Sequence, residues 1–329
     1  MKYHKLQEIE GRYNLDMSSN LKAVEEKYPI LVSDYYFNLI DQKNIPFDPI
    51  WKQCIPNGKE LEDTTSSEDP FQEEQQMPAP RLIHRYQDRA LLLTTNQCHT
   101  YCRFCFRKRY WKNDVKQNNI SDEELDQVCD YLSTNQNIRE ILVSGGDPLT
   151  LSTKRLKHIL DKLTAIQNID VIRIATRAPV VQPSRIDKKL VDMLSQQSGL
   201  WFVAHFNHPN EVTPQSIDAC TLITKSGIPI LNQTVLLKDI NDNASILADL
   251  FRKLIKIKLK PHYLFHVDPV RGVKHFTTGI DCGLNILNQF RNTLSSIATP
   301  HFCIDIPNGI GKISLQPNYS PQINADKHR

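Results

Sequence analysis

The sequence predicts an α/β fold in which a parallel sheet is covered by helices on its outer side. Six expected strands, each an apolar run, alternate with five stretches of helical spacing between residues 90 and 267. Right-handed crossovers would roll such a sheet toward a barrel or open it as a doubly wound sheet. In either form, functional residues are expected at the carboxyl ends of the strands.

The boundaries of these elements come from local signals. Ser121 and Glu124 have the spacing of a capping box, which predicts a helix start, and Gly227 closes a later helix. The expected strands cover residues 90–93, 140–144, 171–175, 200–205, 229–235 and 262–267, and the expected helices cover residues 121–134, 153–166, 188–195, 214–226 and 243–255.

The flanking regions differ in composition from this core. Residues 1–81 are predicted to form an N-terminal extension that wraps the core, residues 82–300 the barrel domain, and residues 301–329 a short C-terminal segment. Within the extension, residues 60–80 are rich in acids, Ser, Gln and Pro and are predicted to be a surface connection. Four aromatic residues of the extension have apolar bulk to bury: Tyr35, Tyr36, Phe37 and Trp51.

Composition excludes several classes of function. The 329 residues carry 40 Lys and Arg against 37 Asp and Glu, a balance that argues against a nucleic-acid partner. No apolar run approaches the roughly 20 residues of a membrane helix, and the N-terminus lacks the apolar core of a secretory signal. We therefore expect a cytoplasmic location. The eight cysteines suit a reducing compartment better than a disulfide framework, and most of the five isolated ones are expected to be buried.

The strongest motif is CxxxCxxC, formed by Cys98, Cys102 and Cys105 directly after the first strand. Three thiols at this spacing can bind three irons of a four-iron, four-sulfur cluster and leave the fourth iron without a protein ligand. An open metal position is typical of catalytic sites. The alternative is a structural zinc site with His99 or a distant His as fourth ligand, although zinc motifs usually contain a second CxxC or HxxxH pair.

Polar residues also follow the other expected strands. After the second strand, Gly145 and Gly146 would let the backbone approach a bound amino acid closely and offer N–H groups to it. The alternative is a tight turn that caps the next helix. The polar residues at the ends of the second to sixth strands are Ser144 to Asp147, Thr176 and Arg177, His205 to Glu211, Asn232 and Gln233, and His266 to Asp268.

Lys312 follows two closely spaced glycines near the C-terminus, the second of them Gly311. It is either a solvated turn lysine or a lysine that anchors pyridoxal 5′-phosphate (PLP), which needs an open backbone and a phosphate clamp elsewhere. Arg85, Tyr86 and Arg89 could supply this clamp with two guanidinium groups and a phenol.

Together, these motifs resemble those of radical S-adenosylmethionine (SAM) enzymes, and from about residue 35 to 319 the chain resembles the lysine 2,3-aminomutase family. The resemblance is carried by HRYQDRALLLTTNQC, SGGDPL, IRIATRAPVVQPSRI, HFNHPNEVTPQS and DIPNGIGKISLQPNY. It implies a radical SAM partial (β/α)6 barrel with an N-terminal extension and a short C-terminal segment that carries the PLP lysine. It also implies a [4Fe-4S] cluster, SAM and PLP as cofactors, and an isomerase that converts L-lysine to β-lysine by 1,2-amino migration.

The same resemblance implies roles for single residues. Cys98, Cys102 and Cys105 would bind the cluster, and Lys312 would be the catalytic PLP anchor. Arg107 would bind the substrate carboxylate, while Asp268 and Asp305 would bind its ε-ammonium; a glutamate-specific relative is not expected to keep both acids. The residues implied to contact cofactors are Arg85, Tyr86, Arg89, Ser144, Gly145, Gly146, Asp147, Arg177 and His205.

Several alternatives stay open at this point. CRFCFRKR and LNQTVLLKDINDNA are similar to the short branch that makes (R)-β-lysine for elongation factor P, whereas DIPNGIGK and VDPVRG favour the free-standing aminomutases. A second alternative is a radical SAM enzyme that acts on another basic amino acid, or one that uses SAM for another reaction with Lys312 merely structural. A metal-stabilised binding module is a third. The implied reaction needs an electron donor, a reductase, flavodoxin or ferredoxin. The product enantiomer and homo-oligomerisation are left open.

Overall fold

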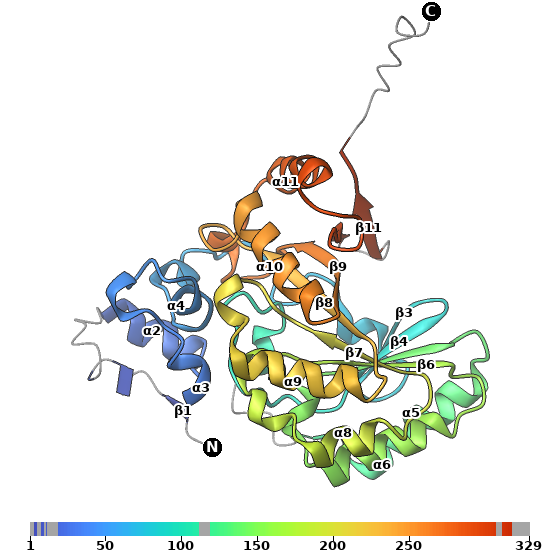
Figure 1. Ribbon diagram of the computed structural model, residues 1–329. Helices are drawn as coiled ribbons and strands as arrows, with labels where there is room; N and C mark the ends of the chain where they lie inside the picture. Colours follow the sequence, from blue (N-terminus) through green and yellow to red (C-terminus); the bar gives the residue numbers. More distant parts are fainter. Residues whose placement is uncertain are drawn as a thin grey trace, which may run out of the picture.

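The computed structural model shows a nearly closed sheet of nine strands in the order β11-β10-β9-β8-β7-β6-β5-β4-β3 (Figure 1). Neighbouring strands from β4 to β10 run parallel, and the edge strands β3 and β11 pair antiparallel with their neighbours. This architecture confirms the predicted α/β barrel class. The structure describes residues 3–4, 8–9, 11, 19–111, 119–306 and 311–317.

All six predicted strands are present, with bounds shifted by up to three residues. Three strands of the main sheet, β3, β10 and β11, were not predicted. The strands are β3 (Leu82–Tyr86), β4 (Arg89–Leu93), β5 (Glu140–Ser144), β6 (Val171–Ala175), β7 (Leu200–Ala204), β8 (Ile230–Leu236), β9 (Leu259–His266), β10 (His301–Ile306) and β11 (Gly311–Leu315), and a separate pair is formed by β1 (Tyr3–His4) and β2 (Val32–Ser33).

The helices between these strands follow one another along the outer side of the sheet (Figure 1). The predicted capping box is confirmed, because the Glu124 N–H donates to Ser121 Oγ and the Ser121 N–H donates to Glu124 Oε2. The helices are α5 (Asp122–Thr134), α6 (Thr153–Thr164), α7 (Ala178–Val181), α8 (Lys188–Leu194), α9 (Pro214–Lys225), α10 (Ala244–Lys256) and α11 (Ile280–Thr293), with α2 (Ser19–Lys27), α3 (Asp34–Phe37) and α4 (Pro49–Cys54) before the barrel.

The core lies between the sheet and its helices. One row of side chains crosses five adjacent strands in hydrogen-bonding register, and each of its members is at most 2% exposed. Such a row holds neighbouring strands at fixed heights, so the strand ends meet at one edge of the sheet. Its members are Val143, Ile174, Phe202, Ile230 and Leu259.

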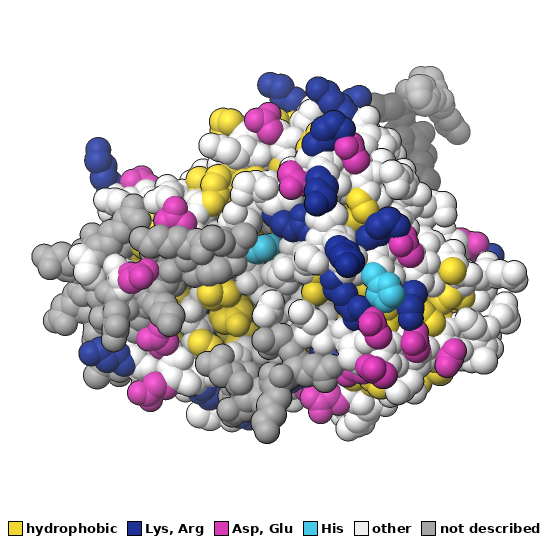
Figure 2. Space-filling model, turned by 90° about the horizontal axis from the view of Figure 1, so that it is seen from below, with side chains coloured by type: hydrophobic (Ala, Val, Ile, Leu, Met, Phe, Trp, Pro, Cys, Tyr) yellow, Lys and Arg dark blue, Asp and Glu magenta, His cyan; other side chains and the backbone are white. Residues whose placement is uncertain are grey.

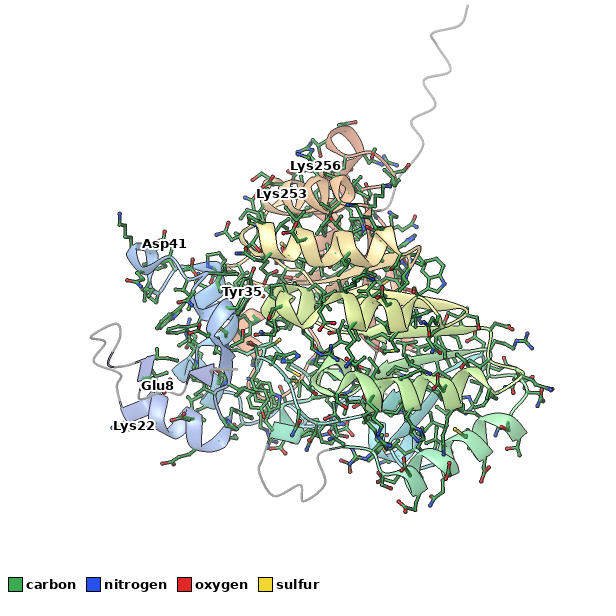
Figure 3. The ribbon with its side chains drawn as sticks, turned by 60° about the horizontal axis from the view of Figure 1, so that its bottom comes forward. Glu8, Lys22, Tyr35, Asp41, Lys253 and Lys256 are labelled. Carbon is green, nitrogen blue, oxygen red and sulfur yellow. The ribbon has the colours of Figure 1, made fainter. Side chains whose placement is uncertain are left out.

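The N-terminal helices α2 to α4 lie beside the barrel (Figure 1). Tyr36 and Phe37 are fully buried in the same apolar cluster as the barrel core. The Tyr35 hydroxyl is hydrogen-bonded to the Thr213 hydroxyl at the start of α9, where this segment meets the barrel (Figure 3). Hydrogen bonds as well as apolar packing therefore join the two parts.

The prediction of a surface connection at residues 60–80 is wrong for acidic residues such as Glu60 and Glu73, whereas Glu62 and Glu74 are exposed. Glu60 is fully buried and Glu73 is 6% exposed. Glu60 accepts hydrogen bonds from Arg103 and Lys108, two bases of the cysteine loop. Because these partners lie more than 40 residues away, the local composition of the segment gives no sign of them.

The outer surface carries mixed charge. On one helix-covered face, Lys and Arg side chains lie among Asp and Glu side chains (Figure 2). Lys157 pairs with Asp161 on α6, and Lys188 pairs with Asp192 on α8. Among the helices of the described residues, none has the length and apolar character needed to cross a membrane.

Candidate active site

The three cysteines of the motif lie in the loop that follows β4, and all three are free thiols. Burial first, and the neighbouring Cys105 next, raise the pKa of Cys98 well above its usual value. Asp147 and Cys102 also contribute to this shift, so the three sulfurs and one carboxylate share one electrostatic environment. A positively charged iron centre would relieve this repulsion, because metals bind cysteine as thiolate. The thiols therefore fit the implied cluster.

A single-ion site does not emerge from the same residues. Among the described His, Cys, Asp and Glu side chains, no group of three is placed to hold one metal ion. A four-iron cluster differs in that each cysteine binds a separate iron. His99 is buried, and the charged neighbours that act on its pKa are Asp147 and Arg185.

Aromatic rings surround the cysteine loop. Tyr101 stacks on Trp111 with ring centroids 4.6 Å apart, and Phe104 lies edge-on to Phe276. Trp111 and Phe104 are both nearly buried. These rings limit water access to the sulfurs, which is one of the factors that set the potential of an iron–sulfur centre.

The turn after β5 packs tightly against the same loop. A Cβ atom on Gly145 would lie 2.2 Å from the Thr95 carbonyl oxygen, and one on Gly146 would lie 2.2 Å from that of Gln97. The Gly146 and Asp147 N–H groups donate to these two carbonyl oxygens. The two glycines therefore serve close contact with the segment that leads into Cys98.

Asp147 uses its carboxylate inside the protein. One oxygen accepts hydrogen bonds from the Leu149 N–H and the Thr176 hydroxyl, and the other accepts from the Arg177 N–H. Asp147 therefore caps the short turn that begins at Pro148 and ties the end of β5 to the end of β6. These contacts are those of the alternative interpretation of the segment from Ser144 to Pro148, a turn that caps the following helix.

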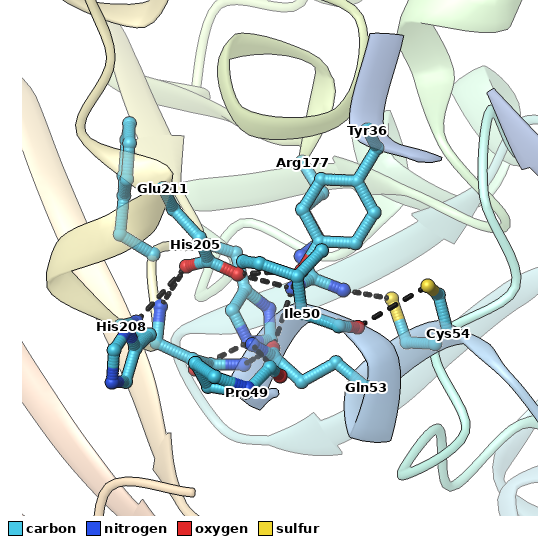
Figure 4. Close-up of polar contacts among 12 residues, drawn as sticks. Tyr36, Pro49, Ile50, Gln53, Cys54, Arg177, His205, His208 and Glu211 are labelled. Carbon is cyan, nitrogen blue, oxygen red and sulfur yellow. Dashed lines mark hydrogen bonds and ion pairs between the residues drawn. The ribbon is translucent and has the colours of Figure 1, made fainter. Parts of the chain in front are cut away.

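Arg177, directly after β6, points toward the cysteine loop (Figure 4). Its Nη1 lies 2.7 Å from Cys102 Sγ, and its Nη2 donates to Glu211 Oε1 at 2.8 Å. His205 at the end of β7 lies close to Phe104. Burial first, and the charge of Arg177 next, lower the pKa of His205 to about 3, so its ring is neutral near pH 7.

Lys312 and the predicted phosphate clamp meet where the two edges of the sheet approach each other. The backbone N–H of Lys312 donates to the Tyr86 hydroxyl at 3.0 Å, and Arg85 Nη1 lies 2.9 Å from Asp305 Oδ1. Arg89 stacks on the Tyr86 ring at 3.9 Å. Barrel closure thus brings together segments that are more than 200 residues apart.

Gly311 makes this contact sterically possible. Its φ is +81°, and a Cβ atom there would lie 2.6 Å from the Tyr86 ring. The preceding residues of the predicted lysine loop, 307–310, lie outside the described residues.

The two expected ammonium-binding acids share one environment with charges of both signs. Burial first, and Asp305 next, raise the pKa of Asp268 to about 7, while Lys312 and Arg107 lower it. Glu73 also raises it. Five charged groups from five separate segments therefore meet around Asp268. They are Asp268 itself, Asp305, Lys312, Arg107 and Glu73.

Arg107 already has a carboxylate partner. Its Nε and Nη2 donate to Glu73, with Nη2 at 2.6 Å from Oε1. Because a guanidinium group has two edges that can each bind a carboxylate, the Nη1/Nη2 edge remains for a second one. Arg109 Nη2 also donates to Glu73, at 2.8 Å.

Sequence reasoning missed the supporting acids and amides of the site. Glu73 and Glu60 were assigned to a surface connection, and Tyr36 was treated only as apolar bulk. Gln53 was given no role. Their partners come from distant segments, and only the acid content of residues 60–80, opposite the basic CRFCFRKR segment, could have suggested ion pairs.

Comparisons with known proteins identify the family to which the chain belongs. Residues 92–250 match the family model of the radical SAM superfamily. The fold is similar to that of a radical SAM methyltransferase from Sphaerobacter thermophilus, with a TM-score of 0.51 and 15% identity over 69% of this chain and 71% of that one. The nearly closed barrel and the cysteine motif thus define a radical SAM enzyme.

The sequence relatives are more specific. The chain is 40% identical over 93% of its length to a putative L-lysine 2,3-aminomutase of Aquifex aeolicus, of which it covers 83%. It is 40% identical to the L-lysine 2,3-aminomutase of Clostridium subterminale (90% of this chain, 71% of that one) and 38% identical to the glutamate 2,3-aminomutase of Clostridioides difficile (91% and 70%). The chain belongs to the lysine 2,3-aminomutase family, whose members are isomerases.

Proposed function

We propose that the protein is a SAM- and PLP-dependent radical aminomutase that converts L-α-lysine to β-lysine. The observation that carries this proposal is the set of charges around Asp268. Asp305 lies 3.4 Å from Lys312, and the charges of Asp305, Lys312 and Arg107 all act on the pKa of Asp268. Lysine carries a carboxylate at one end and an ammonium at the other, so its charges complement this arrangement.

Each end of the substrate has an assigned partner. The free Nη1/Nη2 edge of Arg107 would bind the α-carboxylate, because Glu73 occupies only the other edge. Asp268 and Asp305 would bind the ε-ammonium. A glutamate substrate would place a second carboxylate beside these acids, and like charges at close range cost several kcal/mol. We therefore propose lysine rather than glutamate.

The cofactors supply the chemistry that side chains cannot. SAM on the reduced cluster supplies a 5′-deoxyadenosyl radical, and PLP supplies an aromatic ring that delocalises the substrate radical. Cys98, Cys102 and Cys105 would hold the cluster. The turn from Ser144 to Asp147, together with His205, would border the SAM that binds to it.

The PLP site would lie at the seam of the barrel. Lys312 would anchor PLP through its Nζ, and Arg85, Tyr86 and Arg89 would hold its phosphate and ring. Arg85 Nε is buried and has no hydrogen-bond partner among the described residues, which leaves a donor for an anionic group. The Lys312 side chain is 35% exposed, so its amine is accessible.

The fate of the product belongs to the same proposal. The similarity of CRFCFRKR to the elongation factor P branch suggests that the β-lysine is destined for a translation factor. The reaction would take place in the cytoplasm and would require a reductase, flavodoxin or ferredoxin as electron donor.

The test is an anaerobic assay of the reconstituted protein. With cluster, SAM, PLP, dithionite and L-lysine present, we expect β-lysine by mass spectrometry in the wild type and its loss in Lys312→Ala. Lys154→Ala serves as the control, because Lys154 lies on the outer surface at the start of α6. Ornithine, arginine and glutamate are assayed in parallel.

The outcomes separate the alternatives. Formation of 5′-deoxyadenosine without β-lysine would retain the radical SAM chemistry and remove lysine as substrate. Turnover of another basic amino acid in preference to lysine would support the alternative of a radical SAM enzyme that acts on that amino acid. Absence of both products, from protein that holds an intact cluster and PLP, would refute the proposal.

A further inference from the structure

Arg177 makes a contact that binding of SAM alone does not explain. Its Nη1 lies 2.7 Å from Cys102 Sγ, while its side chain is only 7% exposed. In the described structure, this is the one guanidinium group hydrogen-bonded to a sulfur of the motif. Cys105 instead accepts a hydrogen bond from a backbone N–H, that of Arg107, at 3.4 Å. The three sulfurs therefore have unequal surroundings.

The other terminal nitrogen of Arg177 is fixed by three acceptors (Figure 4). Nη2 donates to Glu211 Oε1 at 2.8 Å and to Gln53 Oε1 at 2.6 Å. It also lies 3.0 Å from the Tyr36 hydroxyl, which donates to the same Glu211 oxygen at 2.7 Å. Tyr36, Gln53 and Glu211 are all fully buried.

Glu211 is itself held in place. Its second oxygen, Oε2, accepts hydrogen bonds from the backbone N–H groups of Asn207 and His208 in the loop after β7. The Arg177–Glu211 pair is therefore rigid, with the positive end toward Cys102 and the negative end away from it. The N-terminal extension, through Tyr36 and Gln53, completes the arrangement.

Such a pair acts on a redox centre in a predictable direction. Hydrogen bonds to cluster sulfurs and nearby positive charge stabilise the reduced, more negative state and so raise the reduction potential. The effect is large where water is excluded, since the effective dielectric constant is low there. The other bases of the loop contribute less, because among the described residues their side chains donate no hydrogen bond to a sulfur of the motif. Arg103 and Lys108 pair with Glu60, and Arg107 and Arg109 pair with Glu73.

We propose that Arg177 is a positioning residue that sets the reduction potential of the cluster through its contact with Cys102, and that Glu211, Tyr36 and Gln53 hold it in that position. This inference rests on the proposed function, because it requires that the three cysteines bind a cluster. It goes beyond that function by assigning to the N-terminal extension a part in controlling the cluster.

The test measures potential rather than turnover. The reconstituted protein is titrated anaerobically without SAM, and the reduced cluster is followed by electron paramagnetic resonance. In the wild type, two different nitrogens of the Arg177 guanidinium contact Cys102 and Glu211. The single ammonium nitrogen in Arg177→Lys cannot contact both groups at once. We expect a more negative midpoint potential than in the wild type. Tyr36→Phe, which leaves both charges in place, should give a smaller shift in the same direction.

A second variant guards against misfolding. Removing Arg177 alone would leave the buried Glu211 without its cationic partner, so the double variant Arg177→Gln/Glu211→Gln removes both charges together. Its potential should also be more negative, since the positive end of the pair is the nearer one. The matched control is Arg173→Lys, which changes an arginine of β6, the strand that precedes Arg177; Arg173 pairs with Glu140 and not with a cysteine.

The outcomes are distinct. The inference would be overturned if Arg177→Lys and the double variant had the same potential as the wild type and Arg173→Lys, measured in folded protein with full iron and sulfide. That result would leave the proposed function intact. A shift to more positive potential would overturn the inference as well. Failure of the wild type to take up a cluster would instead refute the proposed function, and the inference with it.

Discussion

Asp305 and Lys312 lie directly opposite each other on β10 and β11, with Oδ2 and Nζ 3.4 Å apart. On its other side, Asp305 is 2.9 Å from Arg85 of β3. One carboxylate therefore joins the two edge regions of the nearly closed sheet. A substrate ammonium that binds Asp305 would replace Lys312 as its partner, which couples occupation of the site to release of the lysine amine.

Asp305→Asn should weaken lysine binding by about 1.5–3 kcal/mol, because a hydrogen-bonded charge is replaced by a neutral amide. This corresponds to a rise in KM of about 10- to 150-fold. Asp170→Asn is the control, since Asp170 is exposed and pairs with Arg139 away from the site. Steady-state kinetics with lysine measure the effect, and an unchanged KM in Asp305→Asn would remove Asp305 from the substrate site.

Lysine binding should strengthen as pH rises through about 7. Burial and the neighbouring Asp305 raise the pKa of Asp268 to about 7, so this group gains its negative charge in that range while the ε-ammonium remains protonated. Kinetics between pH 6 and pH 8 should show a falling KM in the wild type and a flatter profile in Asp268→Asn. Identical profiles in the two proteins would contradict this assignment.

The same pKa shift affects folding. Because the folded-state pKa of Asp268 lies above its unfolded value, its stabilising contribution is fully present below about pH 4 and is lost as pH rises to about 7. Asp268→Asn should therefore become more stable relative to the wild type as pH rises from 4 to 8. Urea unfolding of the cofactor-free protein at several pH values measures the difference, and a difference that does not vary with pH would disprove it.

Glu73→Gln should lower the free energy of unfolding by about 3 kcal/mol, because it leaves the buried guanidinium group of Arg107 without its carboxylate and takes from Arg109 one of its acidic partners. Arg107 and Arg109 both donate to Glu73, whose side chain is 8% exposed. The matched control is Glu74→Gln: Glu74 is the next residue, its side chain is 68% exposed, and such pairs contribute about 0–1 kcal/mol. Equal losses in the two variants, measured by urea unfolding, would argue against the buried pairs.

Gly311→Ala should destabilise the protein more than Gly227→Ala. Both glycines have positive φ, so alanine strains the backbone by about 1 kcal/mol at either position. At Gly311 the added methyl group would also lie 2.6 Å from the Tyr86 ring, whereas at Gly227 no atom lies within 4 Å. Chemical unfolding measures the two losses. PLP uptake, read from its absorbance, should fall only in Gly311→Ala, and equal effects of the two changes would disprove the contact with Tyr86.

The regular part of the barrel was predictable because its signals are local. The apolar runs at β5 and β6 and the capping box at Ser121 and Glu124 lie within a few residues of the elements they specify. Strand β3 was missed, since His84, Arg85 and Tyr86 are polar or half-buried residues of an edge strand. Edge strands lack the continuous apolar run that marks strands buried on both faces.

The sequence alone determined the class of the enzyme, because the CxxxCxxC motif and the polar strand ends require only near neighbours in the chain. The tertiary structure decided which charges meet. Glu73 lies on Arg107, Glu211 holds Arg177 against Cys102, and Arg85 and Lys312 meet at Asp305. Buried charges need partners, yet those partners come from segments 7 to 220 residues apart, and only the folded chain brings them within contact distance.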